Sequence, residues 1–239
     1  MKSISNVSLA DLARERILAA ILRKDYTRRL PPEEELAEML DVSRTTIRSA
    51  LQSLEQEGVV TRRRALGTTI NAHIGPSTLA LQRLVGFDGL LEEKGYEVRV
   101  EAGWERTVPS QEITEAFGVA ADEEVLLTHK VYFADEARAI TITDAVCWSD
   151  LKRTERLETE IPVSMFEFSR LHFRQPIDHA VVEILSLVHR EGNTTLAVAE
   201  GDAFTRLHER HHTSDGEMIA TSIIDVDNSY IRFEVFRRE

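Results

Sequence analysis

Residues 31–71 contain two short helical patterns, a two-residue turn and a basic hairpin, and this order constrains the fold more than any other feature. Pro31-Pro32 and the glutamates at 33–35 predict a helix start, because proline suits the first turn and carboxylates favour a helix N-terminus. Asp41-Val42 is long enough only for a turn, and Ser43 can cap the next helix. Four apolar residues at helical spacing predict the inward face of that helix: Ile47, Ala50, Leu51 and Leu54.

A hairpin is expected directly after this second helix. Gly58 ends the helix, Val59–Thr61 begins a strand, and three arginines lead to a glycine-containing return strand. This arrangement is a winged helix-turn-helix, in which the second helix enters the major groove of DNA. The residues expected from this pattern to contact DNA are Ser43, Arg44, Thr45, Thr46, Arg48, Arg62, Arg63 and Arg64.

The charge is divided unevenly along the chain. The net charge is −12 over 239 residues, but residues 1–75 hold 12 Lys/Arg and 10 Asp/Glu, whereas the rest hold 17 and 31. The basic part therefore coincides with the predicted DNA-binding segment, and phosphates should repel the acidic remainder. No apolar run approaches the length of a membrane span, and no signal peptide is expected at the N-terminus. A single cysteine, Cys147, fits a reducing cytoplasm.

The rest of the chain predicts an α+β domain on an antiparallel sheet. Strands are expected at 97–108, 125–133, 139–146, 180–188, 204–212 and 218–227, and a further strand at 230–236. Asp135-Glu136 and Asp215-Gly216 predict hairpin turns. Helices are expected at 8–24, 79–94, 110–117 and 163–171, with Asn193 capping a short one to about Glu200. We expect a DNA-binding domain over 1–72, a linker over 73–78 and a second domain over 79–239.

The N-terminal residues resemble the GntR family of bacterial transcription regulators. The resemblance is carried by Leu30-Pro31, Glu35-Leu36-Ala37, Val42–Arg48, Ala50-Leu51, Leu54-Glu55, Glu57-Gly58 and Gly67-Thr68. It implies a homodimer that binds an operator of inverted half-sites and is released by a small metabolite. It also implies that Gly67 and Thr68 lie in the wing and belong to the DNA-binding residues. Two positions differ from the family pattern: Glu34 stands where an arginine is usual, and Ala65-Leu66 occupy the tip of the wing.

The C-terminal part resembles the UTRA effector-binding domain of the HutC-like subfamily, which has a chorismate lyase-like fold. Its markers here include Phe87 with Gly95, Val108-Pro109, Val182-Glu183 and Phe233. The resemblance, together with a polar stripe at alternate positions of one strand, gives the expected effector-binding residues. These are Gly86, Phe87, Lys130, Tyr132, Ser164, Met165, Phe166, Arg206, His208, Ser222 and Asp227.

Family members that bind phosphorylated sugars use basic residues on the first hairpin of this domain and a glutamate and an arginine near the last one. The aligned residues here are Lys130, Tyr132, Ala220 and Asp227, and only Lys130 keeps the charge that the family has at its position. The hypothesis is an effector less anionic than a sugar phosphate, carrying an apolar or aromatic group.

Enzymatic and metal chemistry are not expected. His208, His211 and His212 are close in sequence, but neighbouring strand residues point to opposite faces, so pocket-lining or surface histidines are the expectation. Ser164, Ser222 and the histidines show no nucleophile-elbow or triad spacing, and no cofactor or metal is expected.

The sequence predicts a dimeric, ligand-responsive transcription factor of the cytoplasm, acting as a repressor. Its partners would be double-stranded operator DNA, a small effector and a second copy of itself, with no membrane. Two alternatives remain: a constitutive DNA-binding protein whose C-terminal domain only dimerises, and an enzyme fused to a DNA-binding head.

Overall fold

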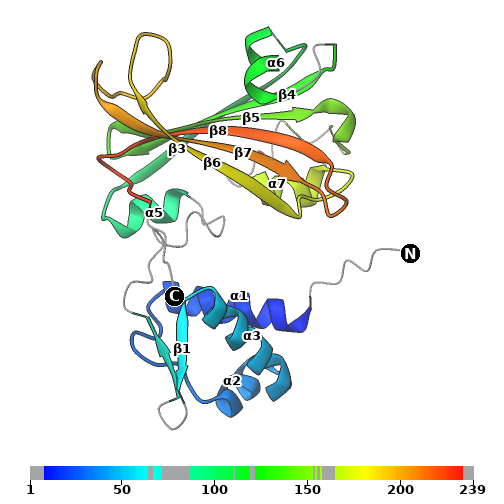
Figure 1. Ribbon diagram of the computed structural model, residues 1–239, viewed down its shortest axis with the longest axis vertical. Coiled ribbons are helices and arrows are strands. Elements are labelled where there is room, and N and C mark those ends of the chain that lie inside the picture. The colour runs from blue at the N-terminus through cyan, green and yellow to red at the C-terminus, as the bar shows by residue number, and fades with distance from the viewer. Residues whose placement is uncertain are drawn as a thin grey trace. The chain divides into compact units, whose positions relative to one another are not determined.

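The computed structural model describes residues 8–63, 67–71, 87–109, 111–118, 122–152, 154, 157 and 165–233 (Figure 1). They fall into two compact units, one within residues 8–71 and the other within 87–233. The predicted linker at 73–78 and residues 79–86, where the sequence predicts the start of a helix, lie outside the described residues. No helix among the described residues is long and apolar enough to cross a membrane.

The N-terminal unit contains three helices and a two-stranded hairpin. The helices are α1 (Leu9–Leu22), α2 (Glu33–Leu40) and α3 (Arg44–Gln56), and the strands are β1 (Val60–Arg63) and β2 (Gly67–Ile70). The core combines the apolar stripe of α3 with residues of α1, among them Ala13, Ile17 and Ile21. Leu9 and Leu12 at the start of α1 are 63% and 44% exposed, so the buried part of the helix begins at Ala13.

Local backbone geometry explains the tight joint between α2 and α3. Asp41 ends α2 in the left-handed conformation, with φ of 53°, and its N–H donates to the Glu38 carbonyl. Val42 donates to the Ala37 carbonyl at 3.0 Å, so the last turn of α2 is closed by backbone hydrogen bonds. Ser43 then caps α3, which fixes the direction in which α3 leaves the turn.

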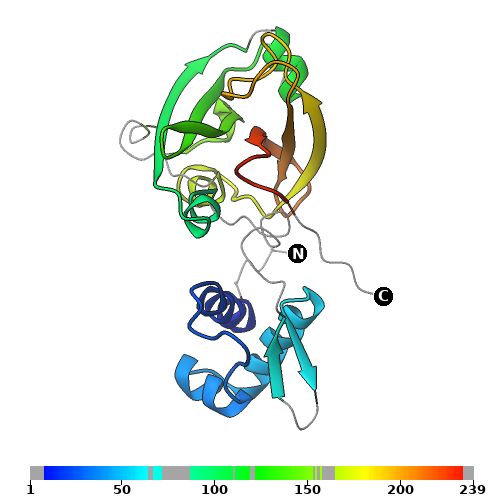
Figure 2. The same ribbon diagram turned by 90° about the vertical axis from the view of Figure 1, so that its left-hand side faces the viewer.

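The second unit is built on one six-stranded antiparallel sheet. Its strands are β3 (Val98–Thr107), β4 (Val125–Ala134), β5 (Ala137–Cys147), β6 (His179–Val188), β7 (Ala203–His212) and β8 (Met218–Asp227). Their order across the sheet is β3-β4-β5-β8-β7-β6, so β8 lies between β5 and β7. The two predicted hairpins, β4–β5 and β7–β8, are confirmed. Figure 2 shows the sheet strongly curved, with β3 and β6 at its two edges.

Helices lie on both faces of this sheet. Figure 1 shows α5 (Phe87–Glu93) and α7 (Met165–His172) on one face and α6 (Gln111–Phe117) on the other. Two apolar clusters fill the α5/α7 face: Leu90 and Leu91 of α5 pack with Tyr132 and Ile140, whereas Met165 and Phe168 of α7 pack with Val146. A smaller cluster on the α6 face includes Phe117 and Leu127.

Two sequence expectations for this unit are wrong. Residues 193–200 form turns and irregular chain instead of a helix, because Asn193 closes the loop that follows β6. Its side chain accepts a hydrogen bond from the Arg190 N–H and donates one to the Val188 carbonyl. Tyr230–Phe233 is not a strand, because the chain turns after β8: the N–H groups of Tyr230 and Ile231 both donate to the Asp227 carbonyl. Residues 234–236 lie outside the described residues.

Candidate DNA-binding surface and ligand sites

The N-terminus of α3 is organised by hydroxyl groups. Ser43 has extended backbone angles, and its Oγ accepts a hydrogen bond from the Thr46 N–H at 3.1 Å. Its Oγ also lies 2.8 Å from Oγ1 of Thr46. Both hydroxyls are therefore committed to the cap, while the neighbouring backbone N–H groups and the positive end of the helix dipole face an exposed surface. Thr45 is exposed as well.

Glu33, the first residue of α2, contacts both α3 and the β1–β2 hairpin, which is the wing of the winged helix-turn-helix. Its two carboxylate oxygens accept hydrogen bonds from Nη2 of Arg48 at 3.1 Å and Nη2 of Arg62 at 2.7 Å. Partial burial of Glu33 raises its pKa, but the hydrogen bonds and positive charges of the two arginines outweigh that effect, so its pKa lies below the ordinary value. One carboxylate thus holds an arginine of α3 and an arginine of β1 on the same side of the unit.

Arg44 and Arg48 remain accessible despite these contacts. Nη1 of Arg44 lies 3.5 Å from a carboxylate oxygen of Glu34, and 59% of the Arg44 side chain is exposed. The Arg48 side chain is 61% exposed. Exposed ion pairs of this kind contribute little to stability, so both guanidinium groups can exchange a carboxylate for a phosphate or a guanine edge.

The described part of the wing supports only some of the predicted contacts. Arg63 is exposed, and Gly67 has a φ of 77°, a left-handed conformation that favours glycine at the start of β2. Thr68 is only 9% exposed, and its carbonyl accepts a hydrogen bond from the Leu30 N–H. The expectation of a DNA contact from the Thr68 side chain therefore receives no support from its position. Arg64 lies outside the described residues.

The sheet divides the predicted effector-binding residues between its two faces. Residues paired across neighbouring antiparallel strands point to the same face. On the α5/α7 side lie Phe87, Lys130, Tyr132, Met165, Phe166 and Ser222. On the α6 side lie Arg206, His208 and Asp227. The described predicted residues are therefore not brought together on one face, because alternate strand residues point to opposite faces; Gly86 and Ser164 lie outside the described residues.

Six buried polar residues meet on the α5/α7 face. We call this group the buried polar cluster, and it comprises Thr128, Lys130, Asp144, Glu209, His211 and Ser222. It lies between the apolar clusters under α5 and α7, and none of its members is more than 8% exposed. Buried charged groups need partners, so the internal contacts determine what this cluster can do.

Asp144 is the centre of the buried polar cluster. It accepts hydrogen bonds from Lys130 Nζ at 2.9 Å, Thr128 Oγ1 at 2.6 Å and Ser222 Oγ at 2.6 Å. Burial raises its pKa, but the charge of Lys130 and the three hydrogen bonds outweigh this effect and hold the pKa below its ordinary value. Asp144 is therefore ionised at neutral pH, and the Lys130–Asp144 pair carries no net charge.

The hydrogen bonds also fix the tautomer of His211. Ser222 has one hydroxyl hydrogen, which it donates to Asp144, so Nε2 of His211 at 2.9 Å must be the donor to the Ser222 oxygen. Nδ1 of His211 is then a buried acceptor, and it has no hydrogen-bond partner among the described residues. Burial lowers the pKa of His211 to about 4, so the ring is neutral at pH 7.

Glu209 completes the buried polar cluster without forming a catalytic triad. Burial, with a smaller contribution from Asp144, raises the pKa of Glu209 to about 7. Its carboxylate oxygen lies 3.7 Å from Nε2 of His211, the same nitrogen that faces Ser222. A triad needs the acid on the opposite ring nitrogen, so this geometry does not activate Ser222.

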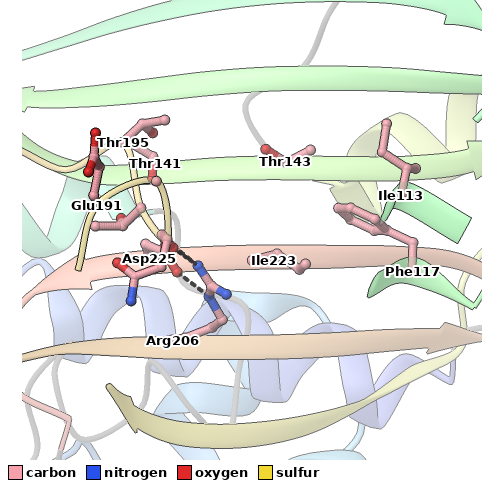
Figure 3. A pocket seen from close by; sticks show the side chains of 12 residues that line it. Ile113, Phe117, Thr141, Thr143, Glu191, Thr195, Arg206, Ile223 and Asp225 are labelled. Carbon is pink, nitrogen blue, oxygen red and sulfur yellow. Dashed lines mark hydrogen bonds and ion pairs between the residues drawn. The ribbon is translucent and has the colours of Figure 1, made fainter. Parts of the chain in front are cut away.

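A pocket of about 570 Å³ lies on the opposite, α6 face of the sheet (Figure 3). At one end Arg206 makes a paired contact with Asp225, from Nε to Oδ1 at 2.6 Å and from Nη2 to Oδ2 at 2.8 Å. Nη2 also donates to the Asn193 carbonyl at 2.7 Å. Ile113 and Phe117 of α6 form the other end. Of the predicted residues, only Arg206 lines this pocket.

Sequence analysis missed Asp144, Thr128 and Asp225 as site residues. A usable signal was present: Asp144 and Asp225 are charged residues inside otherwise apolar or threonine-rich strands, where a charge is retained only with a buried partner. The partners themselves come from other strands, so their identity follows only from the register. The described residues include no group of three or more His, Cys, Asp or Glu that could hold a metal ion.

The chain therefore combines a winged helix-turn-helix unit with an α+β unit built on an antiparallel sheet. The comparisons with known proteins show what the first unit is similar to. Residues 9–70 match the model described as bacterial regulatory proteins, gntR family. Over these residues the winged helix-turn-helix of this chain is therefore similar to the gntR-family regulatory proteins.

Curated relatives of the chain are named as transcriptional regulators. The HTH-type transcriptional regulator GgaR of Escherichia coli is 28% identical over 165 residues, covering 69% of this chain and 63% of GgaR. The chain thus spans less than two thirds of the length of that relative. The Uxu operon transcriptional regulator of Escherichia coli is 62% identical over 39 residues, or 16% of this chain and 15% of that protein.

Solved structures support the fold of both units. The chain is similar to YydK from Bacillus subtilis, described as a possible transcriptional regulator, with a TM-score of 0.64 and 17% identity over 97% of this chain and 100% of YydK. PhnF from Mycobacterium smegmatis matches with a TM-score of 0.50 and 18% identity, covering 95% of this chain and 99% of PhnF. At these identities the likeness concerns the fold. The named relatives are regulators, which gives the enzyme alternative no support.

Proposed function

We propose that this protein binds double-stranded operator DNA and regulates transcription in response to a small effector held by its C-terminal unit. The observation that carries the DNA-binding half is the geometry at the start of α3. A capped helix N-terminus stands beside Arg44 and Arg48, which are 59% and 61% exposed, and Glu33 joins this surface to the wing through Arg62. Such a helix fits the major groove while the wing contacts the neighbouring backbone.

Duplexes selected from a random pool test the DNA-binding half directly. The full-length protein should enrich a short sequence with two inverted half-sites about one helical turn apart. Affinity for the selected duplex should exceed affinity for a scrambled duplex by a factor of about 10³ or more. Enrichment of no sequence over several rounds would overturn the proposal.

The effector site is proposed to be the α5/α7 face of the sheet, and residues 79–239 are proposed to form a UTRA domain of the HutC-like type. The buried polar cluster supports this, because it retains hydrogen-bonding capacity that the described residues do not use. Among the described residues Lys130 Nζ makes one hydrogen bond, to Asp144, and an ammonium has three donors. Nδ1 of His211 is an acceptor without a partner in the same part of the chain, and the ring of Phe166 lies 5.6 Å from the His211 ring.

The charge of this cluster favours an effector with little negative charge. Asp144 already neutralises Lys130, His211 is neutral, and Glu209 has a pKa of about 7. A doubly charged phosphate placed here would meet no uncompensated positive charge among the cluster residues, and burying it would be costly. The aromatic rings of Phe87 and Tyr132 at one end, and of Phe166 at the other, favour an apolar or aromatic group on the effector.

Calorimetric titration with a metabolite panel tests the effector class. Uncharged or weakly charged compounds should include a binder whose affinity falls at least tenfold in Lys130→Met. The control variant Val131→Phe changes the next residue of β4, on the α6 face, and should bind this compound normally. Tight binding of glucosamine 6-phosphate would overturn the proposal. In gel-shift titrations the binder should release the selected duplex, as a repressor requires, with about 1–3 kcal/mol of coupling.

A homodimer is proposed to form through β6. This strand is an edge of the sheet, and Val181, Ile184 and Val188 on it are 45%, 52% and 48% exposed. The other edge, β3, carries four charged residues, which oppose edge-to-edge pairing, whereas β6 carries Glu183 as its only Asp, Glu, Lys or Arg. Antiparallel pairing of two β6 strands creates a two-fold axis, the symmetry that inverted half-sites require.

A further inference from the structure

We propose that the pocket on the α6 face is a second ligand site, separate from the buried polar cluster, for an uncharged molecule with adjacent hydroxyl groups at one end and an apolar group at the other. Nucleosides and aryl glycosides have this chemistry. Its volume of about 570 Å³ lies within the usual range for small-molecule sites.

The two sites cannot share one ligand through the sheet. Along β5, Asp144 belongs to the buried polar cluster, whereas Thr141 and Thr143 line the pocket. Along β8, Ser222 belongs to the cluster, whereas Ile223 and Asp225 line the pocket. Neighbouring residues of a strand point to opposite faces, so the sheet itself separates the two sites.

The polar end of the pocket suits hydroxyl groups better than an anion. Both Asp225 oxygens already accept from Arg206, so the pair has no net charge, and Glu191 adds a carboxylate to the lining. An anionic ligand would have to displace Asp225, which is 4% exposed and would be left buried without its partner.

The same pair retains capacity for a neutral partner. Nη1 of Arg206 makes no hydrogen bond among the described residues, and each carboxylate oxygen of Asp225 has a second lone pair. One hydroxyl can accept from Nη1 while the adjacent hydroxyl donates to Asp225. Figure 3 shows Thr141 and Thr195 close to this end, where their hydroxyls add donors and acceptors.

The other end of the pocket is apolar and fixes the orientation of the ligand. Ile113 and Phe117 come from α6, and Ile223 comes from β8. Figure 3 shows Ile113 and Phe117 at the end away from Arg206 and Asp225. A flat apolar group fits against these side chains while the hydroxyl groups reach the ion pair.

The test titrates the full chain with adenosine, uridine and phenyl glucoside, and with the charged counterparts adenosine monophosphate and glucose 6-phosphate. We expect at least one uncharged compound to bind with a millimolar or lower Kd, and its charged counterpart to bind at least tenfold more weakly. Absence of binding by all uncharged compounds, or tighter binding of the charged ones, would overturn the proposal.

Paired variants locate the binding. Thr141→Phe adds an aromatic ring inside the pocket without removing a recorded side-chain hydrogen bond, and it should weaken binding at least tenfold. Val131→Phe makes the same kind of change at the neighbouring position on β4, outside the lining, and should bind as wild type does.

Hydrogen exchange of the wild-type chain gives the location without any variant. The bound compound should slow exchange of backbone N–H groups in the loop 191–195 and in α6. Slowed exchange confined to α5 and α7 would place the compound on the other face and contradict the proposal.

Discussion

Nη2 of Arg48 and a carboxylate oxygen of Glu33 lie 3.1 Å apart, and the other oxygen of Glu33 holds Arg62 at 2.7 Å. If this surface binds DNA as proposed, Glu33 acts as a positioning residue: it orients Arg48 of α3 and Arg62 of β1 while its own charge repels phosphate. Removing its charge separates these two effects, because repulsion affects all DNA equally and orientation affects recognition of sequence.

In Glu33→Gln we expect affinity for a scrambled duplex to rise and the ratio of specific to non-specific affinity to fall by about three- to tenfold. Fluorescence anisotropy with the selected and scrambled duplexes measures both quantities. Glu35→Gln is the matched control, since Glu35 is an exposed carboxylate of the same helix turn. An unchanged ratio in Glu33→Gln would remove the positioning role.

Arg63 tests the wing. It is exposed on β1, and a phosphate contact would release about one counterion on binding. Arg63→Ala should therefore weaken binding to selected and scrambled duplexes alike and lower the slope of log affinity against log salt by about one unit. A loss of affinity that leaves the salt slope as it is in wild type would mean that Arg63 contacts no phosphate.

Glu209 and His211 predict an unusual pH dependence of stability. The native pKa of Glu209 is about 7 against an ordinary 4.5, so the native state keeps a proton that the unfolded state loses, and the free energy of unfolding falls as pH rises between these values. The native pKa of His211 is about 4 against 6.5, so the opposite change occurs between 4 and 6.5. The two contributions offset from about pH 4.5 to 6.5.

Glu209→Gln should remove that offset. Relative to wild type, the free energy of unfolding of the variant should rise with pH by about 1.4 kcal/mol per unit between pH 4.5 and 6.5. His211→Gln should show the opposite trend. Urea unfolding followed by tryptophan fluorescence reports on the C-terminal unit, because both tryptophans, Trp104 and Trp148, lie there. Parallel pH curves for Glu209→Gln and wild type would contradict these pKa values.

The proposed role of the β6 edge in homodimer formation can be tested with a charged substitution. Ile184→Lys places a charge at the proposed two-fold interface and should raise the dimer dissociation constant at least tenfold, measured by sedimentation or by light scattering after gel filtration. Val108→Lys changes an equally exposed aliphatic residue beside the other edge strand and should leave the dimer intact. A dimer unaffected by Ile184→Lys would place the interface elsewhere.

The sequence predicted local structure well where a short-range rule applied. Asp-Gly at 215–216 and Asp-Glu at 135–136 gave both hairpins, and the cap and apolar spacing gave α3 from Ser43 onward. The position of β8 between β5 and β7 depends on long-range pairing, which no local pattern encodes. For that reason only the strand register shows that Asp144, Ser222 and His211 lie in one cluster. The same holds for the pair of Arg206 and Asp225 on the other face.

Recognition of DNA by the start of α3 is tested most directly by the double variant Arg44→Ala/Arg48→Ala, measured on the selected duplex at fixed salt. Loss of two charged contacts should weaken specific binding by at least 100-fold, or about 2.7 kcal/mol. The control Arg138→Ala/Arg232→Ala removes two exposed arginines of the C-terminal unit and should bind as wild type does. Undiminished affinity of the Arg44/Arg48 variant for the selected duplex would show that this surface does not bind DNA.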